Sequence, residues 1–511
     1  MEFHDGSVKT AILYASLLTA SVWLFRAVRR SWRLPPGPRG LPFWGNILQV
    51  PSGKQWIAYT EWARQYGPIF SLRFYSERVF ILNTQAIASD ILDKRSNTSA
   101  ARPENMVVAA DLIGWNRAIS LSQNYTSHRR LMARALNPTA VRQYRSLQEQ
   151  SAEALVRDMM TTPADFYDHI RNGIGRQIVN ISYGRNMTIR GRDFITYAEE
   201  VHDVFFLTAR PYSYVVDFVP ILKHVPSWVP GFSFIRKAGE WRKDLDELVE
   251  APFQMVRAEL ARDDAPPSYV TDSLQKSEIK ALTQEEEDSI KWSASSLYTG
   301  GADSTIASLT GFVLLMCHFP AAQRRAQQEI DEVTGGDRLP TFEDAPRLKY
   351  VWACVQEALR YRPVLPLGIP HRVTSHEVYD GYDIPKDSTV IANMWAILHD
   401  ENLYSDPFDF KPERFLSRED GGLEEPDSTA IVFGYGRRIC PGMHLAEGSL
   451  LIYTARILAV LDISPAKDDK GEDILPPVDV DLRGSALVSM PKRFECNIKP
   501  RSPLARSLVA S

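Results

Sequence analysis

One of the four cysteines of this chain lies in a stretch rich in glycine. Residues 433–442 read FGYGRRICPG, which places Cys440 in a frame of glycines, arginines and a proline. A cysteine can bind zinc, act as a nucleophile, or bind haem iron as a thiolate. Zinc sites need cysteines or histidines paired at short spacing. No CxxC pair exists among the four cysteines, which are Cys317, Cys354, Cys440 and Cys496.

The glycines of this stretch allow two other interpretations. A dinucleotide-binding loop reads GxGxxG and opens a helix; Gly434 and Gly436 begin that pattern, but Ile439 occupies the position of the third glycine. A nucleophilic cysteine needs a base nearby in the fold. A haem thiolate needs glycines that let the backbone close around the sulfur. On this stretch alone, both of these hypotheses stay open.

An acid and two hydroxyls follow a pair of glycines in a long helical pattern. Residues 300–305 read GGADST. Two glycines inside a helix cost about 2 kcal/mol relative to alanine, which indicates a close backbone approach or a local opening of the helix. Asp303, Ser304 and Thr305 then supply an acid and hydroxyls beside that opening. Taken alone, an ordinary helix break explains the motif too.

Two further short motifs carry charges. Residues 357–360 read EALR, so Glu357 and Arg360 are three residues apart and share one helix face. Residues 412–415 read PERF and offer Arg414 as a third member of the same network. Most such pairs are solvated surface pairs worth less than about 1 kcal/mol.

The elements that must position these residues are mainly helical. Alternation predicts a hairpin over residues 69–82, with Ser76-Glu77 between its strands, and short β-like pieces over residues 369–391. Prolines interrupt residues 211–232, so we expect that this stretch does not form one long helix. The sequence therefore predicts an α-rich domain with a minor, clustered β region and no alternating βαβ units. Helices are predicted over residues 56–66, 125–134, 143–160, 285–317, 319–333, 350–361 and 444–461.

The N-terminus differs from the rest of the chain. Residues 10–25 are uncharged and would span about 24 Å as a helix. A cleavable signal peptide would carry positive charge before this segment, whereas here the arginines, Arg26, Arg29, Arg30 and Arg33, follow it. We therefore predict a membrane anchor with a basic flank over residues 1–33 and a cytosolic catalytic domain over residues 34–511. A formal net charge of −4 gives no indication of nucleic-acid binding.

Together and in this order, the motifs resemble the cytochrome P450 family, of the membrane-anchored class II type. FGYGRRICPG matches the family's haem loop FGxGxRxCxG at every fixed position, and EALR, PERF and GGADST match its ExxR, PxRF and oxygen-binding helix motifs. LPPGPRGLP at residues 34–42 is similar to the proline hinge behind a membrane anchor. The resemblance covers nearly the whole chain and implies the P450 fold: mainly α with a minor β region, one large haem-binding domain after a transmembrane helix. PHRV at 370–373 and CPGMHLA at 440–446 are similar to fungal members that modify secondary metabolites.

The resemblance also implies the roles of individual residues. Cys440 is then the thiolate ligand of haem b iron, and Asp303 and Ser304 are the acid–alcohol pair for oxygen activation, with Thr305 able to share that task. Ser304 stands where most members have threonine. The residues implied to contact the haem or its propionates are Tyr125 (where the family has tryptophan), Arg129, His371 or Arg372, Phe433, Arg438 and Cys440.

The implied activity is that of a monooxygenase, which inserts one atom of O2 into a C–H bond. The chain has no nucleotide fingerprint of its own, so the electrons must come from a separate NADPH-cytochrome P450 reductase, and Arg130 and Arg134 are candidates to face it. A haem-thiolate isomerase or dehydratase, which needs no reductase, and a non-catalytic haem-binding protein are the alternatives. The resemblance places pocket residues in apolar segments, which predicts an apolar substrate: a terpenoid, indole alkaloid or polyketide. These segments are residues 107–119, 205–214, 297–301, 364–369 and 485–488.

Overall fold

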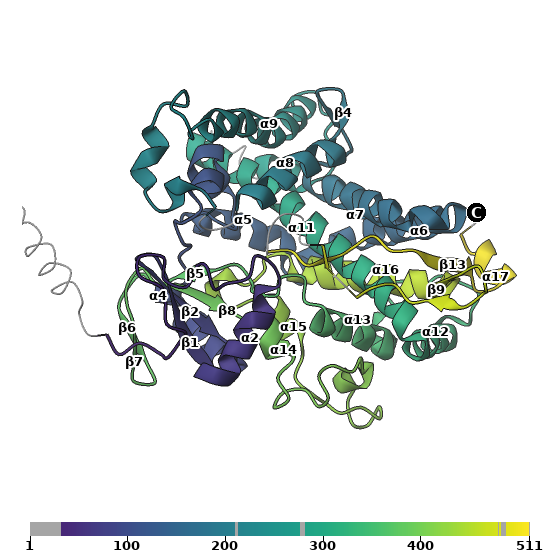
Figure 1. The fold of residues 1–511 in the computed structure, drawn as a ribbon. Helices are drawn as coiled ribbons and strands as arrows, with labels where there is room; N and C mark the ends of the chain where they lie inside the picture. Colours follow the sequence, from purple (N-terminus) through teal and green to yellow (C-terminus); the bar gives the residue numbers. More distant parts are fainter. Residues whose placement is uncertain (1–31, 210–212, 276–281, 479, 482–486, 510–511) are drawn as a thin grey trace, which may run out of the picture.

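The computed structural model describes residues 32–209, 213–275, 282–478, 480–481 and 487–509. Within these ranges the chain is mainly helical with small sheets, which confirms the predicted fold class (Figure 1). The predicted anchor helix over residues 10–25 lies outside the described residues.

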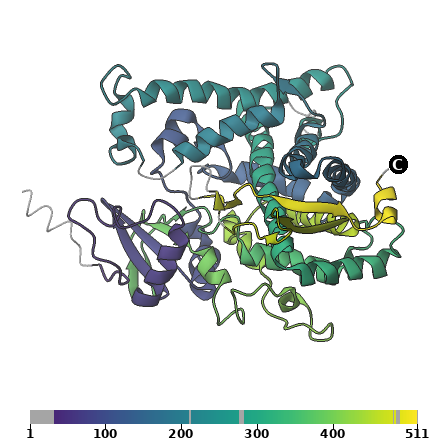
Figure 2. The ribbon, with the colours of Figure 1, turned by 45° about the vertical axis from the view of Figure 1, so that its right-hand side comes forward.

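A central helix, α11 (Gln284–His318), organises the helical part, and Figure 2 shows other helices around it. It begins with a capping box, in which the Thr283 hydroxyl accepts from the Glu286 N–H and the Glu286 carboxylate accepts from the Thr283 N–H. Most of its side chains are buried. Its bounds match the predicted 285–317.

The other predicted helices are present with ends shifted by a few residues at most. Six α-helices of five residues or more in the described residues were not predicted from the sequence: the long α7, α8 and α9 and the short α10, α14 and α17. The helices of five residues or more are α2 (Gln55–Tyr66), α5 (Tyr125–Leu136), α6 (Arg145–Thr161), α7 (Phe166–Tyr183), α8 (Phe194–Thr208), α9 (Phe234–Leu260), α10 (Tyr269–Gln275), α12 (Pro320–Thr334), α13 (Lys349–Tyr361), α14 (Met394–Leu398), α16 (Met443–Val460) and α17 (Pro503–Ser507).

The largest sheet has the order β1-β2-β8-β5 and lies beside α2, away from most helices (Figure 1). Its hairpin pairs Phe74 with Glu77, so the turn residues are Tyr75 and Ser76 rather than the predicted Ser76 and Glu77. Strand β2 then pairs in parallel with β8, and β8 in antiparallel fashion with β5. The strands of this sheet are β1 (Ile69–Phe74), β2 (Glu77–Leu82), β5 (His371–Arg372) and β8 (Thr389–Ala392).

Smaller sheets complete the β content. A three-stranded sheet has the order β10-β9-β13, and three two-stranded pairs join β3 to β4, β6 to β7 and β11 to β12. Their strands are β3 (Thr188–Ile189), β4 (Arg192–Asp193), β6 (Glu377–Tyr379), β7 (Tyr382–Ile384), β9 (Leu461–Lys467), β10 (Asp473–Ile474), β11 (Val480–Asp481), β12 (Met490–Pro491) and β13 (Cys496–Pro500).

Among the described residues, α11 alone is long and apolar enough to cross a membrane. However, 78% of its most apolar window is buried inside the protein. We therefore interpret α11 as a core helix.

The charged motifs EALR and PERF form one buried network. Glu357 accepts from Arg360 at 2.6 and 2.9 Å and from Arg414 Nε at 3.3 Å, and all three side chains are fully buried. Arg414 also pairs with Glu425 at 2.9 Å. The network thus balances two cations with two carboxylates, and the surface-pair interpretation is wrong.

Replacing Glu357 by glutamine is expected to destabilise the protein by about 3–5 kcal/mol, because two buried guanidinium groups would lose their shared counter-charge. Urea unfolding of the purified protein measures this loss. Asp420→Asn is a matched control, because Asp420 pairs with the exposed Lys349 and such a surface pair is worth about 1 kcal/mol or less. Equal losses in the two variants would contradict a structural role for the network.

A buried histidine beside this network predicts acid sensitivity. His399 hydrogen-bonds to the Trp395 carbonyl through Nδ1 (2.8 Å), and burial together with the Arg360 charge lowers its pKa to about 3. Below pH 6.5 His399 binds a proton in the unfolded protein but not in the folded one, so the free energy of unfolding decreases as the pH falls. Between pH 7 and 5 the wild type should lose about 2 kcal/mol more than His399→Gln, measured by urea unfolding. A pH dependence identical in both proteins would exclude this origin.

Candidate active site

The loop before α16 is folded tightly around Cys440. The Cys440 N–H donates to the Phe433 carbonyl at 2.8 Å. Gly434 and Gly436 have φ angles of 82° and 53°, in the left-handed region that favours glycine. A Cβ on Gly436 would lie 2.4 Å from the Leu92 carbonyl oxygen, so this position accepts glycine alone.

The surroundings of the Cys440 thiol are not those of a nucleophile. Burial raises its pKa, while the Gly442 N–H and the charge of Arg129 act in the opposite direction. Among the described residues, no histidine or carboxylate hydrogen-bonds to the thiol, so it has no general base. The Gly442 N–H and the Arg129 charge favour the thiolate, the form of cysteine that binds a metal, against the opposing effects of burial and Glu447 on the pKa of Cys440.

Three guanidinium groups gather beside the loop. Arg438 donates to the carbonyls of Ala100 (2.7 Å), Ile119 (3.1 Å) and Ser122 (2.8 Å), and Arg129 donates to that of Ile439 (2.7 Å). The third group belongs to Arg102, which the sequence reading missed. It is 4% exposed and donates to the carbonyls of Ser120, Ile369 and Pro370.

This cluster of Arg102, Arg129 and Arg438 lacks a counter-charge. None of the three forms an ion pair with a carboxylate within the part of the chain that the structure describes. Burial lowers the pKa of Arg438 to about 10 and that of Arg102 well below its usual value, and the neighbouring cations lower both further. Buried cations are normally paired, so the cluster fits a ligand with negative charges, such as the two propionates of haem.

The remaining predicted propionate residues lie around this cluster in different ways. The Tyr125 ring lies under Arg438, 3.5 Å from the guanidinium carbon, in a cation–π contact. His371 is buried, and its Nδ1 bonds to the Ser99 carbonyl at 2.8 Å. Burial and Arg102 hold its pKa well below the usual value, so its ring is neutral. Arg372 turns to two surface carboxylates, Glu104 (2.8 Å) and Asp387 (3.3 Å), so Arg102 rather than Arg372 joins the cluster.

The middle of α11 carries a stripe of small residues that is not covered by other parts of the protein. Gly300, Ser304 and Ser308, spaced four apart, are exposed or half-exposed in the middle of a mostly buried helix. A methyl group added to Gly300 would meet open space. The helix is continuous here, so the predicted local opening is wrong. The Ser304 hydroxyl donates to the Gly300 carbonyl at 2.8 Å.

The acid and the second hydroxyl lie on other faces of α11. Thr305 is 5% exposed and donates to the Gly301 carbonyl at 2.7 Å, so it is not part of the open stripe. Asp303 is 6% exposed, and its Oδ2 lies 2.8 Å from Nδ1 of His202 on α8. His202 is a second residue that the sequence reading missed, because a single histidine in an apolar helix gives no motif.

Two of the predicted pocket segments are tied together by a carboxylate. Asp217 accepts from the N–H groups of Val107 (2.9 Å) and Tyr214 (3.1 Å), which belong to the predicted segments 107–119 and 205–214. Burial raises the pKa of Asp217 to about 6. Residues 210–212 and 485–486 of the predicted pocket lie outside the described residues.

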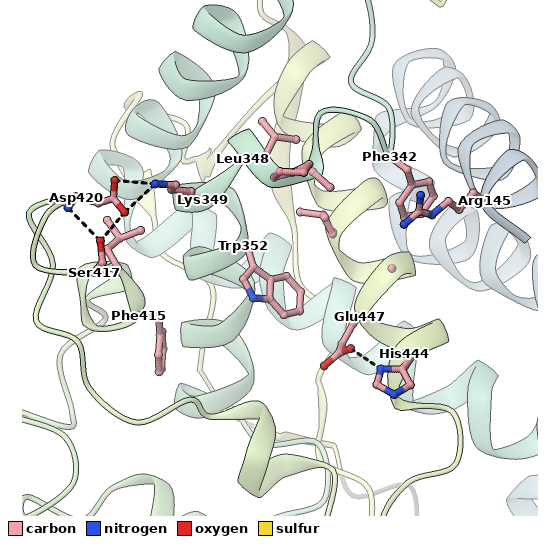
Figure 3. A pocket seen from close by; sticks show the side chains of 15 residues that line it. Arg145, Phe342, Leu348, Lys349, Trp352, Phe415, Ser417, Asp420, His444 and Glu447 are labelled. Atoms are coloured by element: carbon pink, nitrogen blue, oxygen red, sulfur yellow. Dashed lines mark hydrogen bonds and ion pairs between the residues drawn. The ribbon is translucent and has the colours of Figure 1, made fainter. Parts of the chain in front are cut away.

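Two surface grooves meet at His444. One, of about 560 Å³, runs between α5 and the Cys440 loop and is lined by Arg129, Arg130 and Arg437 without any carboxylate. The other, of about 500 Å³, is shown in Figure 3. In this groove His444 pairs with Glu447 and Lys349 with Asp420, while Arg145 lies over the Phe342 ring in a cation–π contact.

Comparisons with known proteins agree with this geometry. The family model described as cytochrome P450 matches residues 35–495. The chain is 36% identical to cytochrome P450 monooxygenase 208 of Postia placenta over 97% of this chain and 96% of that protein. It is 38% identical to cytochrome P450 monooxygenase claR of Ampulloclitocybe clavipes over 94% and 89% of the two chains. The chain therefore belongs to the cytochrome P450 family of haem-binding monooxygenases.

Proposed function

We propose that the protein is a membrane-anchored haem-thiolate enzyme that inserts one atom of O2 into an apolar small molecule, with electrons from a separate NADPH-cytochrome P450 reductase. The observation that carries this proposal is the Cys440 thiol, which lies near the Gly442 N–H and beside three guanidinium groups, those of the buried Arg102 and Arg438 and of the half-buried Arg129. None of the three pairs with a carboxylate of the described residues. When bound, haem b supplies the iron at which dioxygen is activated.

The residues that would hold the haem follow from the same geometry. Cys440 is the ligand for the iron. The guanidinium groups of Arg102, Arg129 and Arg438 would bind the propionates, and the rigid backbone contacts of Arg438 keep its guanidinium in place. Tyr125, His371 and Phe433 would line the site. Arg372 would act indirectly, since its guanidinium pairs with Glu104 and Asp387.

Asp303 and Ser304 on α11 would deliver protons to dioxygen. The hydroxyl of Ser304 lies on the open stripe of α11, where it can orient water or donate to a bound group. The Asp303 carboxyl is one residue away and is the nearest acid in the motif. Thr305 would support the helix rather than take part, because it is buried away from the open stripe of α11.

The basic groove beside Cys440 supports a docking site for the reductase. Arg130 and Arg437 line it, and no acidic residue does. A groove of one sign of charge attracts a partner of the other sign and speeds association. Arg134, the other predicted contact, is exposed on the same helix.

Exposed apolar residues support contact with membrane lipid. Phe43, Leu48, Ile221 and Trp228 are 67–82% exposed. Tyr75 joins the two segments that carry them, because its ring lies 5.1 Å from that of Phe43 and 4.0 Å from that of Phe218. We propose that this surface, together with the anchor over residues 1–33, holds the domain on the cytosolic face of the endoplasmic reticulum membrane.

This topology predicts that the expressed full-length protein carries no N-linked glycan. Asn97, Asn124, Asn180 and Asn186 each begin an N-x-S/T sequon, and all but Asn180 are exposed on the surface. A lumenal domain would therefore be modified. Mass measurement before and after endoglycosidase treatment gives the answer, and a glycan at any of the exposed sites would refute the cytosolic placement.

The proposed substrate is an apolar, polycyclic or prenylated secondary metabolite of the terpenoid, indole alkaloid or polyketide kind. Its support is the apolar segment with Val364, Leu365, Leu367 and Ile369, which follows α13. Difference spectra with a panel of such compounds would identify the class that binds.

The test of the proposed function is NADPH oxidation in the presence of reductase, measured with and without substrate. A monooxygenase consumes NADPH and O2 in a substrate-dependent manner and forms an oxygenated product. Turnover that proceeds without reductase would favour the isomerase or dehydratase instead. Haem binding without any turnover would favour a non-catalytic carrier.

A further inference from the structure

The acid on α11 is held by a residue from another helix. Oδ2 of Asp303 lies 2.8 Å from Nδ1 of His202 on α8, and both residues are buried. Since a carboxylate accepts, Nδ1 donates when Asp303 is ionised. The next residue, Ser304, bonds back to Gly300 and faces the open stripe. The acid and the alcohol of the motif therefore point to different sides of the helix.

Aromatic rings fix the position of the imidazole. The His202 ring lies 5.5 Å from the Trp115 ring and 5.9 Å from the Phe206 ring. Trp115 is 3% exposed and also contacts Phe205, with ring centroids 4.8 Å apart. Phe205 belongs to one of the predicted pocket segments. The imidazole therefore links Asp303 to the part of α8 that was predicted to line the substrate pocket.

Other charged groups near this pair are themselves paired. Arg171 on α7 forms an ion pair with Glu199, one turn before His202 on α8. Tyr298 on α11 is buried, and burial followed by the charge of Asp303 raises its pKa, so it stays neutral. Asp193 caps the start of α8 by accepting from the Ile195 N–H. His202 thus supplies a direct polar contact to the Asp303 carboxylate.

The geometry points to His202 as the positioning residue of Asp303, which sets the orientation of the acid and couples it to the position of α8. This inference rests on the proposed function, in which Asp303 delivers protons. Proton transfer depends on distance and direction. The hydrogen bond from His202 favours one orientation of the Asp303 carboxylate, and its loss makes other side-chain rotamers more accessible.

Two replacements separate the hydrogen bond from the packing of the ring. His202→Phe keeps an aromatic ring between Trp115 and Phe206 but removes the donor. His202→Asn has an amide N–H near the position of Nδ1 and keeps the donor. His169→Phe on α7 is the control, because the hydrogen bonds of His169 go to Thr162, which is close to it in the sequence.

With reductase and a turned-over substrate, His202→Phe should lower the rate of product formation roughly ten- to a hundredfold, the range for loss of a hydrogen bond to a charged group. More of the NADPH electrons should end as hydrogen peroxide, while the substrate dissociation constant changes less than about twofold. His202→Asn should restore most of the coupling. In an Asp303→Asn background, His202→Phe should have no further effect, because it acts through Asp303.

A second measurement does not depend on turnover. Urea unfolding midpoints of the wild type, both single variants and the double variant should show that the two losses of stability are not additive. Additive shifts of the unfolding midpoints would overturn the inference. A His202→Phe enzyme that forms as much product per NADPH oxidised as the wild type would overturn it as well. If the wild type itself showed no reductase-dependent product, the proposed function would fail, while the unfolding cycle would still report on the pair.

Discussion

Replacing Cys440 by serine is expected to abolish the red-shifted Soret band of the reduced, carbon monoxide-bound protein, and all product formation with it. The band reports a thiolate ligand to haem iron, and a serine hydroxyl does not provide one. The loop geometry supports this assignment, because the Gly442 N–H and Arg129 both favour the thiolate form of Cys440. Absorption spectra of the dithionite-reduced, carbon monoxide-treated protein give the result.

The three other cysteines are the controls. Cys317 and Cys354 are buried in helices, and Cys496 begins strand β13. None of them lies in the loop before α16, so each replaced by alanine should keep the band. Retention of the band in Cys440→Ser, or its loss in one of these controls at normal haem content, would contradict the assignment of the ligand.

Replacing Asp303 by asparagine is expected to lower the rate of product formation by about 10²- to 10⁴-fold, the usual contribution of a general acid. The change keeps the size of the side chain and a possible hydrogen bond to His202, but it removes the proton. Haem content and substrate affinity should be nearly unchanged, since Asp303 is buried against α8 and not on the open stripe of α11. Product formation per NADPH oxidised, with reductase present, measures the effect.

Variants of the neighbouring hydroxyl complete this test. Ser304→Ala should leave NADPH oxidation running while more electrons end as hydrogen peroxide, because the alcohol that orients water is lost. Ser304→Thr should be neutral or improve coupling, since the added methyl restricts χ1 and the hydroxyl can still bond to Gly300. Wild-type turnover by Asp303→Asn, without any need for reductase, would replace the monooxygenase by a haem-thiolate isomerase.

The sequence by itself determined the parts of this protein that depend on short-range rules. Periodicity over a few turns predicted α11 and most of the other long helices, since backbone hydrogen bonds within a helix join residues four apart. The Cys440 loop was predictable because the spacing of its glycines, Arg438 and Cys440 matches the P450 haem-loop pattern. Gly434 and Gly436 then adopt the left-handed backbone conformation that favours glycine. Glu357 and Arg360 could be paired because they share one helix face.

Some helices were not predicted because their sequences carry only weak short-range signals. α9 contains Pro252, and α7 contains two glycines, residues that disfavour a helix on local grounds. Both helices exist because their apolar sides pack into the core, where Ile170, Ile174 and Phe253 are fully buried. Tertiary packing thus overrides the local preference.

Only the tertiary structure decided which side chains of the site meet. Arg102 joins Arg438 and Arg129 from a segment without any motif, while Arg372 turns away to surface carboxylates. His202 reaches Asp303 across 101 positions of the chain. Such contacts depend on how helices and loops pack against each other, and the energy of that packing is spread over many distant residues. A short motif can therefore fix the chemistry of one residue, but only the packed fold selects its partners.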